Sequence, residues 1–336
     1  MYEESSVLWY IILSNKLRKI LPTIVKIMLN IIKNKLKPKV KSLVKKLKGS
    51  NENVRLHGMT NISEQQYFEI YAREQYQGIG EIVDLGSWMG STTIPLAKGI
   101  KNNKNCQNKI DKIHAFDRFI WESWMNISSQ DTLKQYQPGD SFLDEFKKRT
   151  KKYSKYIKVY PGDLCEIGWI GKEIEFLLVD AMKSWKLTSS ICQDFFPFLI
   201  PGKSLVLHQD FSHFYTPWIH LVMYRFRDYF EPHYDVPNSP SFVFKYTSKI
   251  PADKLDMDYS FKSFSVEEAE AAVSYSLSCT PQEKHNGIIA AKIMFFAHQK
   301  QYDQAQKEVD KYIKQGYQLE KDLKKASEFI KNKVNS

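Results

Sequence analysis

The sequence is poor in the residues that build disulfide frameworks and zinc sites. Its four cysteines, Cys106, Cys165, Cys192 and Cys279, are scattered through 336 residues, and none belongs to a C-x-x-C pair. Secreted disulfide scaffolds and structural zinc sites use closely spaced, paired cysteines. We therefore expect reduced thiols and a cytoplasmic protein.

A long hydrophobic run is missing from the first 50 residues, which we call the arm. Its longest apolar run, residues 7–13, is much shorter than the ~20 residues that a membrane-spanning helix needs. Two glutamates precede this run and Ser14-Asn15-Lys16 follows it, which is not the order of a secretory signal. Neither a membrane span nor secretion is expected.

Basic charge is also nearly absent outside the arm. The net charge is +11, but residues 1–50 hold 12 lysines and arginines against Glu3 and Glu4, so the other 286 residues sum to about +1. We therefore expect no nucleic-acid partner.

The arm has helical periodicity. Its apolar residues fall on one stripe with lysines opposite, and the pattern repeats after Pro38: Leu17, Ile20, Leu21, Ile24, Met28, then Val40, Leu43, Val44, Leu47. Such a basic amphipathic helix over residues 7–48 is suited to peripheral contact with an anionic membrane surface. It equally suits packing on its own domain or on a second subunit of a homo-oligomer, and both alternatives stay open.

Residues 81–93 carry the clearest signal. A short apolar run ends in Asp84, two glycines follow at Gly86 and Gly90, and a helix begins near Ser91 and Thr92. Glycine lets the backbone approach a ligand, and the first turn of a helix offers unpaired N–H groups. The spacing is Asp-x-Gly-x-x-x-Gly, without the G-x-G-x-x-G that seats a pyrophosphate. The stretch therefore predicts a cofactor loop of another kind.

This stretch resembles the first motif of S-adenosylmethionine-dependent methyltransferases. Residues 84–92 are most similar to the macrocin O-methyltransferase family, with the sequence Asp-Leu-Gly-Ser-Trp-Met-Gly-Ser-Thr. The resemblance spans about residues 57–250. It implies S-adenosylmethionine as cofactor. The residues implied to bind it in this loop are Asp84, Gly86, Ser87, Trp88, Gly90, Ser91 and Thr92.

Two later acids extend the implied cofactor site. Asp117 ends a second short apolar run, at the edge of the sheet where ligands of doubly wound folds gather, and a carboxylate there can accept from both ribose hydroxyls. It matches the ribose-binding acid of the family. Asp163 follows a third run, in the position that faces the adenine amino group in similar enzymes. A turn-stabilising role for Asp163 is the alternative.

Two further strand ends supply the candidate catalytic residues. Residues 174–179 form an almost continuous apolar run that stops at Asp180, and residues 204–207 lead to His208, Gln209 and Asp210. In the family, acids at these positions hold a divalent cation, but here Gln209 replaces one of them. We expect Asp180, His208 and Asp210 to be catalytic, and Asp180, Gln209 and Asp210 to be the ligands of an Mg²⁺ site weakened by the missing charge.

A hydroxyl acceptor of a methyl group must lose its proton, to a base or through a metal. His208 and His213 lie beside Asp210 and are candidate bases. A histidine near a strand end is more often structural. Lys183, after Asp180, is a candidate for binding an acidic acceptor, although a solvated lysine is the commoner role.

The expected fold is α/β. We predict a doubly wound, mostly parallel seven-stranded sheet with helices on both faces, closed by an antiparallel hairpin over residues 230–246, as the resemblance implies. The domain covers residues 51–255 and begins with a helix near Ile62 for which Ser63 is a possible N-cap. Residues 256–336 change to helices only, including a hairpin that resembles one tetratricopeptide unit and must pack on a neighbour.

The sequence thus predicts a cytoplasmic S-adenosylmethionine-dependent O-methyltransferase that acts on a hydroxyl of a small molecule, with a sugar acceptor implied by resemblance alone. Two alternatives remain. One is a non-catalytic scaffold that keeps only the cofactor fold. The other is a nicotinamide-dependent oxidoreductase.

Overall fold

The computed structural model describes residues 56, 58–125, 136–257 and 259–334. The predicted helical arm, with its membrane contact through residues 7–48, lies outside the described residues. No helix among the described residues is long and apolar enough to cross a membrane. All four cysteines are free, as the sequence led us to expect.

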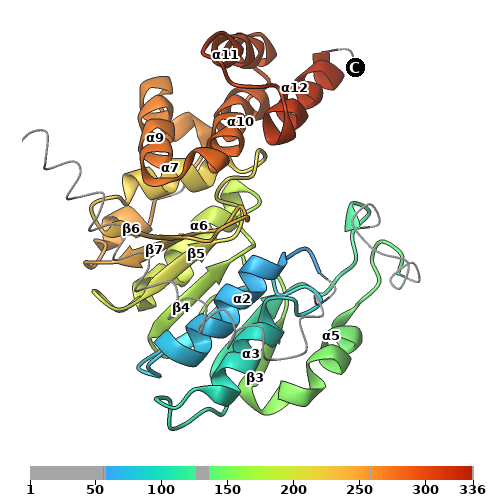
Figure 1. The fold of residues 1–336 in the computed structure, drawn as a ribbon, viewed down its shortest axis with the longest axis vertical. Helices are drawn as coiled ribbons and strands as arrows, with labels where there is room; N and C mark the ends of the chain where they lie inside the picture. The colour runs from blue at the N-terminus through green and yellow to red at the C-terminus, as the bar shows by residue number, and fades with distance from the viewer. Residues whose placement is uncertain (1–55, 57, 126–135, 258, 335–336) are drawn as a thin grey trace, which may run out of the picture. The chain divides into compact units, whose positions relative to one another are not determined.

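A sheet forms the centre of the fold (Figure 1). It has seven strands in the order β3-β2-β1-β4-β5-β7-β6. The strands are β1 (Glu81–Leu85), β2 (Ile113–Asp117), β3 (Ile157–Pro161), β4 (Ile174–Val179), β5 (Leu205–His208), β6 (Phe230–Asp235) and β7 (Phe242–Tyr246). Strands β1 to β5 pair in parallel, and β7 pairs antiparallel with β5 and β6. The predicted sheet and its closing hairpin are confirmed.

Burial along the strands follows their place in the sheet. Every residue of the central strand β4 is buried, as expected of a parallel strand that is covered on both faces. Strand β6 lies at the edge and is mostly exposed. Pro232 is tolerated there because an edge strand has one unpaired side, and the register shifts next to it.

Helices cover both faces of the sheet, in agreement with the doubly wound prediction. On one face, Ile82 of β1 shares a core with Phe68 of α2 (Ile62–Ile70) and Leu96 of α3 (Thr93–Asn102), and α5 (Leu143–Thr150) joins the same core. Val83, the next residue, faces the opposite core, which includes α6 (Trp185–Asp194) and α7 (Pro217–Arg225). The alternation is the period of two that a strand imposes.

The N-cap of α2 is Asn61, and the prediction of Ser63 is wrong. The Asn61 side chain accepts from the Glu64 backbone N–H at 2.9 Å, and Glu64 Oε2 accepts from the Asn61 N–H at 2.8 Å. This reciprocal capping box satisfies two N–H groups that helix geometry leaves without partners. Ser63 lies inside the first turn, where it cannot form that pair.

The C-terminal helices pack beside α7 (Figure 1). They follow the short α8 (Ala252–Leu255) and are α9 (Val266–Cys279), α10 (Gln282–His298), α11 (Tyr302–Lys314) and α12 (Lys321–Val334). Gly287 lets α10 come close to the loop after β5, because a Cβ there would lie 1.8 Å from the Ser212 carbonyl oxygen. Only glycine fits such an approach.

Two buried lysines tie these helices to their surroundings. Lys292 of α10 is fully buried and pairs with Glu270 of α9 and with Glu308 of α11, the latter at 2.7 Å. Lys284, also in α10, pairs with Asp235 at the end of β6 and donates to the Ser241 carbonyl. Because removing one partner would leave a buried charge uncompensated, these pairs fix how the helices pack.

Candidate functional site

The turn after β1 is built around a buried carboxylate. Asp84 Oδ2 accepts hydrogen bonds from the hydroxyls of Thr92, at 2.8 Å, and Thr93, at 2.6 Å, where α3 begins. Burial raises the pKa of Asp84 to about 6, although the two hydroxyl bonds oppose this shift. Asp84 Oδ1 is buried without a hydrogen-bond partner among the described residues. Asp84 therefore joins the end of β1 to the start of α3 and keeps one oxygen unused.

The two glycines of this turn adopt conformations that other residues avoid. Gly86 has φ of 93° and Gly90 has φ of 85°. A Cβ on Gly86 would lie 3.0 Å from the carbonyl oxygen of Asp180, so the turn passes close to the end of β4. The end of β1 and the end of β4 therefore meet at one place, as the neighbouring parallel strands require.

Asp117 connects two loops at the neighbouring strand end. Its Oδ2 accepts from the backbone N–H of Trp88 at 2.8 Å, and its Oδ1 accepts from that of Phe119 at 2.7 Å. Both residues have positive φ, 39° and 53°, and the shared carboxylate holds these strained conformations. Burial raises the pKa of Asp117, against the two backbone bonds. Each oxygen keeps a further acceptor position for a ligand.

The other predicted cofactor residues line the same turn. The Ser87 hydroxyl donates to the Asp84 carbonyl at 3.1 Å. Ser91 is covered by the segment before α2, because its carbonyl accepts from the Thr60 hydroxyl at 3.4 Å and Gly58 packs against its side chain. The indole Nε1 of Trp88 is buried and has no hydrogen-bond partner within the described ranges. The turn is thus enclosed and holds unused polar atoms.

Asp163 lies in the turn after β3. Its side chain accepts from the Cys165 backbone N–H at 2.9 Å, and this bond lowers its pKa. The preceding residue, Gly162, donates its N–H to the Asp117 carbonyl at 2.9 Å, so this turn adjoins the end of β2. The turn-stabilising contact is present, and the predicted adenine contact remains a prediction.

The ends of β4 and β5 bring Asp180 and Asp210 to one lysine. Lys183 Nζ lies 2.9 Å from Asp180 Oδ1 and also contacts Asp210 Oδ2. The two carboxylate side chains are only 14% and 18% exposed, whereas that of Lys183 is 46% exposed. Burial raises the pKa of Asp180, and the Lys183 charge opposes this. The pair of acids is therefore already bridged by a cation.

The predicted metal ligands do not fit a divalent cation in this arrangement. The described residues contain no group of three or more histidine, cysteine or acidic side chains placed to hold a metal ion. Gln209 is buried, and its Oε1 has no hydrogen-bond partner in the described part of the chain. Lys183 lies between Asp180 and Asp210, where a cation would need their oxygens. An ammonium there repels a metal ion.

Neither candidate histidine is placed to act as a base near neutral pH. His208 is fully buried at the end of β5, and burial lowers its pKa to about 3. Its two ring nitrogens have no hydrogen-bond partners among the described residues. Burial also lowers the pKa of His213 to about 4, although the nearby Asp322 of α12 opposes this. Both imidazoles are therefore neutral and weakly basic.

The residue that sequence reasoning undervalued is Lys183. Its spacing from Asp180 was a usable signal, because only two residues lie between them in a short turn before α6. The contribution of α12 had no such signal. Asp322 and Lys325 come from more than 100 residues beyond His213, and the charges of both act on it. Only the packing of the C-terminal helices brings them there.

Comparisons with known proteins find remote similarity only. No protein-family model matches the chain, and no curated protein matches it. A solved structure of the O-methyltransferase NovP is 13% identical, covers 57% of this chain and 83% of its own, and has a TM-score of 0.44. An S-adenosylmethionine-dependent O-methyltransferase from Thermotoga maritima is 12% identical, covers 59% of this chain and 70% of its own, and has a TM-score of 0.37. The mitomycin 7-O-methyltransferase MmcR is 11% identical, covers 62% of this chain and 58% of its own, and has a TM-score of 0.35. Identities and scores this low assign the chain to no family.

Proposed function

We propose that this chain is an S-adenosylmethionine-dependent O-methyltransferase that acts on a hydroxyl of a small molecule. The observation that carries the proposal is the turn after β1. Two glycines with positive φ, Gly86 and Gly90, bring its backbone close to the end of β4, and Asp117 anchors it from β2. The sheet has the antiparallel closing strand that the resemblance of residues 84–92 implies. These features agree with one another and arise from separate parts of the sequence.

The residues of the turn fit the cofactor. Asp84 and Trp88 each keep a buried polar atom without a partner among the described residues, and glycine at position 86 keeps the turn narrow. Asp117, with a free acceptor position on each oxygen, would hold the ribose hydroxyls, and the N–H groups at the start of α3 would face the carboxylate end. When bound, the cofactor supplies a methyl group on a positively charged sulfur.

The ends of β4 and β5 would receive the acceptor. Asp180 lies directly beside the β1 turn, since its backbone N–H donates to the Leu85 carbonyl at 2.9 Å. In the proposed reaction the Asp180 carboxylate would accept the hydroxyl proton as the acceptor oxygen takes the methyl group that the bound cofactor would supply. Most of the acceleration comes from holding the two reactants in line. The low pKa of His208 argues for Asp180 in this role.

A sugar hydroxyl is the proposed acceptor, on the strength of the resemblance to the macrocin family. The experiment measures binding of S-adenosylhomocysteine by calorimetry and transfer of a labelled methyl group into a carbohydrate extract. We expect the wild-type protein to do both. Asp180→Asn should keep the binding and lose at least about 100-fold of the transfer, as expected for removal of a general base. Asp253→Asn, which changes an exposed acid in α8, is the matched control.

Three outcomes would contradict the proposal. Binding of a nicotinamide dinucleotide in preference to S-adenosylhomocysteine would support an oxidoreductase. Binding of S-adenosylhomocysteine without transfer into any hydroxyl compound would support a scaffold that keeps the cofactor fold. Equal transfer by Asp180→Asn and the wild type would remove Asp180 from the reaction.

A further inference from the structure

We propose that the Lys183 ammonium serves as the fixed cation of the acceptor site, in place of a divalent metal, and that it binds the acceptor oxygen directly. This inference rests on the proposed function. It assigns to Lys183 a catalytic role that the paired acids alone do not suggest, and it makes the site independent of metal ions.

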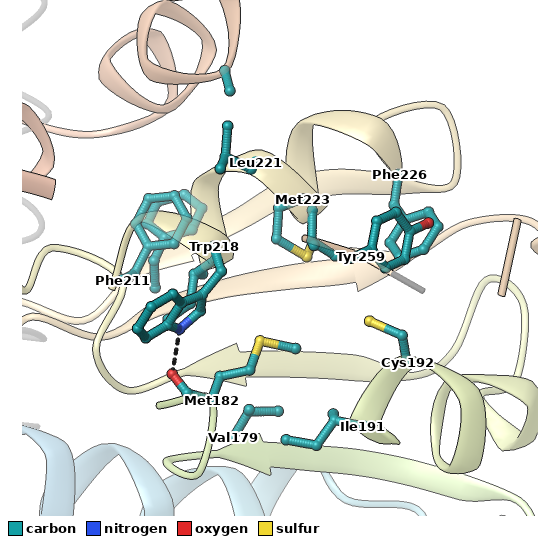
Figure 2. Close-up of a cluster of buried hydrophobic side chains, with 14 of the residues drawn as sticks. Val179, Met182, Ile191, Cys192, Phe211, Trp218, Leu221, Met223, Phe226 and Tyr259 are labelled. Carbon is teal, nitrogen blue, oxygen red and sulfur yellow. Dashed lines mark hydrogen bonds between the residues drawn. The ribbon is translucent and has the colours of Figure 1, made fainter. Parts of the chain in front are cut away.

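The position of Lys183 is set by the backbone around it. Its N–H donates to the Ala181 carbonyl at 2.8 Å, and Ser184, the next residue, caps α6 by accepting from the Leu187 N–H at 3.3 Å. The carbonyl of Met182 accepts from the Trp218 indole at 2.6 Å, within the buried cluster that Figure 2 shows. Lys183 therefore extends from a short, anchored turn, and its side chain starts from a defined place.

The contacts of the ammonium leave it one free donor. A lysine has three N–H donors, and two carboxylates, Asp180 and Asp210, occupy one each. The Lys183 side chain is 46% exposed, so its remaining face is open to a ligand. Both acids are largely buried, so the cation is the most accessible charge at the ends of β4 and β5. An acceptor oxygen that accepts from it would lie beside the proton-accepting carboxylate.

The charge already at this place argues against a metal there. Magnesium keeps several of its waters and is usually bound by one or two carboxylates, so it would need the same two carboxylates that Lys183 contacts. The ammonium of Lys183 already balances one of the two negative charges. A divalent metal ion would have to displace the Lys183 ammonium and would gain only Gln209 as a further protein ligand. In the proposed site the Lys183 ammonium therefore takes the place of a bound metal ion.

The first experiment measures binding of Mn²⁺ by electron paramagnetic resonance, without methyl donor or acceptor. We expect no saturable binding to the wild-type protein at millimolar Mn²⁺. Lys183→Met removes the charge at similar length, and it should raise Mn²⁺ affinity by about 10-fold or more because two carboxylates lose their counter-ion. The gain should disappear in Lys183→Met/Asp210→Asn. Lys186→Met, which changes an exposed lysine of α6, should behave as the wild type.

The second experiment measures methyl transfer after treatment with a chelator. The wild type should keep its turnover. Lys183→Met should lose at least about 100-fold in kcat with unchanged affinity for S-adenosylhomocysteine, whereas Lys183→Arg should recover part of the rate because it keeps the charge. Saturable Mn²⁺ binding to the wild type that Asp180→Asn abolishes would overturn the inference, as would a Lys183→Met variant that neither gains Mn²⁺ affinity nor loses kcat.

Failure of the inference is distinguishable from failure of the proposed function. The Mn²⁺ measurement needs no methyl donor, so it tests the cation site even if the protein transfers no methyl group. Calorimetry with S-adenosylhomocysteine tests the donor site without the acceptor side.

Discussion

The two halves of the sheet's carboxyl edge use their acids in different ways. At the ends of β1 and β2, the acids bind the protein itself: Asp84 accepts from two threonine hydroxyls, and Asp117 accepts from two backbone N–H groups. At the ends of β4 and β5, Asp180 and Asp210 instead share the half-exposed Lys183. Asp84 and Asp117 therefore fix the backbone of the turns, whereas Asp180 and Asp210 hold the positive charge of Lys183 at the surface.

The difference suits the two tasks of the proposed reaction, which are binding the cofactor and activating the acceptor. A cofactor that is the same in every turnover can be bound by a rigid turn, which loses little entropy on binding. An acceptor must be oriented and deprotonated, which needs accessible polar groups beside the methyl carbon. We call the ends of β1 and β2 the donor half and the ends of β4 and β5 the acceptor half. Mutations in the donor half should therefore change mainly affinity and stability, and mutations in the acceptor half should change mainly the rate.

The largest effect is expected at Asp117. In Asp117→Ala the N–H groups of Trp88 and Phe119 both lose their acceptor, and each bond to a charged group contributes about 1.5–3 kcal/mol. Affinity for S-adenosylhomocysteine should fall by about 100-fold or more, since the turn would lose its shape and the cofactor would lose the ribose contact proposed for Asp117. Calorimetry measures this directly.

Asp163→Ala is the comparison for Asp117→Ala. Asp163 makes one bond to a backbone N–H, that of Cys165, in a partly exposed turn. We expect a loss of affinity below about 10-fold, because a single, partly buried hydrogen bond contributes little. Equal losses in the two variants would show that the donor half does not depend on the backbone that Asp117 holds.

Asp84 should make stability depend on pH. Its pKa is about 6 in the folded protein, against an ordinary value of 3.8. A raised acid pKa means that the folded state binds the proton more tightly than the unfolded state does. This contribution is fully present below pH ~4 and is lost as the pH rises through ~6, which corresponds to roughly 3 kcal/mol. Urea unfolding at pH 4, 5, 6 and 7 measures it.

Asp84→Asn isolates this contribution. Burial also raises the pKa values of Asp117, Asp180, Glu64 and Glu175, so these acids give the wild type a slope of the same sign. The amide cannot titrate but still accepts from the threonine hydroxyls, so the slope alone should become smaller. An unchanged slope would mean that the Asp84 carboxyl titrates alike in the folded and unfolded protein.

The sequence allowed the strand ends to be predicted because two patterns coincide there. Apolar runs ended in Asp84, Asp117 and Asp180, and parallel strands bring their carboxyl ends to one edge. What the sequence could not supply was which donor each acid takes. Asp84 accepts from Thr93, which was not among the candidates, and Lys183 reaches Asp210 from a different strand end. Such choices depend on side-chain distances that only packing determines.

The helix cap shows the same limit on a smaller scale. Asn61 and Ser63 both precede apolar positions of α2, and both residue types are good caps. The reciprocal bond with Glu64 decides for Asn61, since the capping box needs a glutamate three residues later. The pairing rule was available in the sequence, whereas the hydrogen bond from Ser241 that fixes Glu64 Oε1 was not.

The smallest effect on rate is expected at His208. A base with a pKa of about 3 takes few protons near neutral pH, and this side chain is fully buried. His208→Phe should therefore change kcat by less than about 3-fold, whereas loss of a true general base costs about 100-fold or more. Removing two buried nitrogens that lack partners among the described residues should also stabilise the fold by about 1 kcal/mol.

His220→Phe separates this explanation from a general effect of buried histidines. Burial lowers the pKa of His220 to about 3 as well, but its Nδ1 lies 2.9 Å from the Ser276 hydroxyl. Its replacement should destabilise the protein by about 1 kcal/mol, because one buried hydrogen bond is lost while the Ser276 hydroxyl keeps its bond to the Ala272 carbonyl. Opposite signs of the two stability changes would show that the effect of each histidine depends on its own hydrogen bonds. A nearly constant kcat in both variants would support Asp180 and Lys183 as the catalytic residues. A large fall in kcat for His208→Phe alone would identify His208 as the general base.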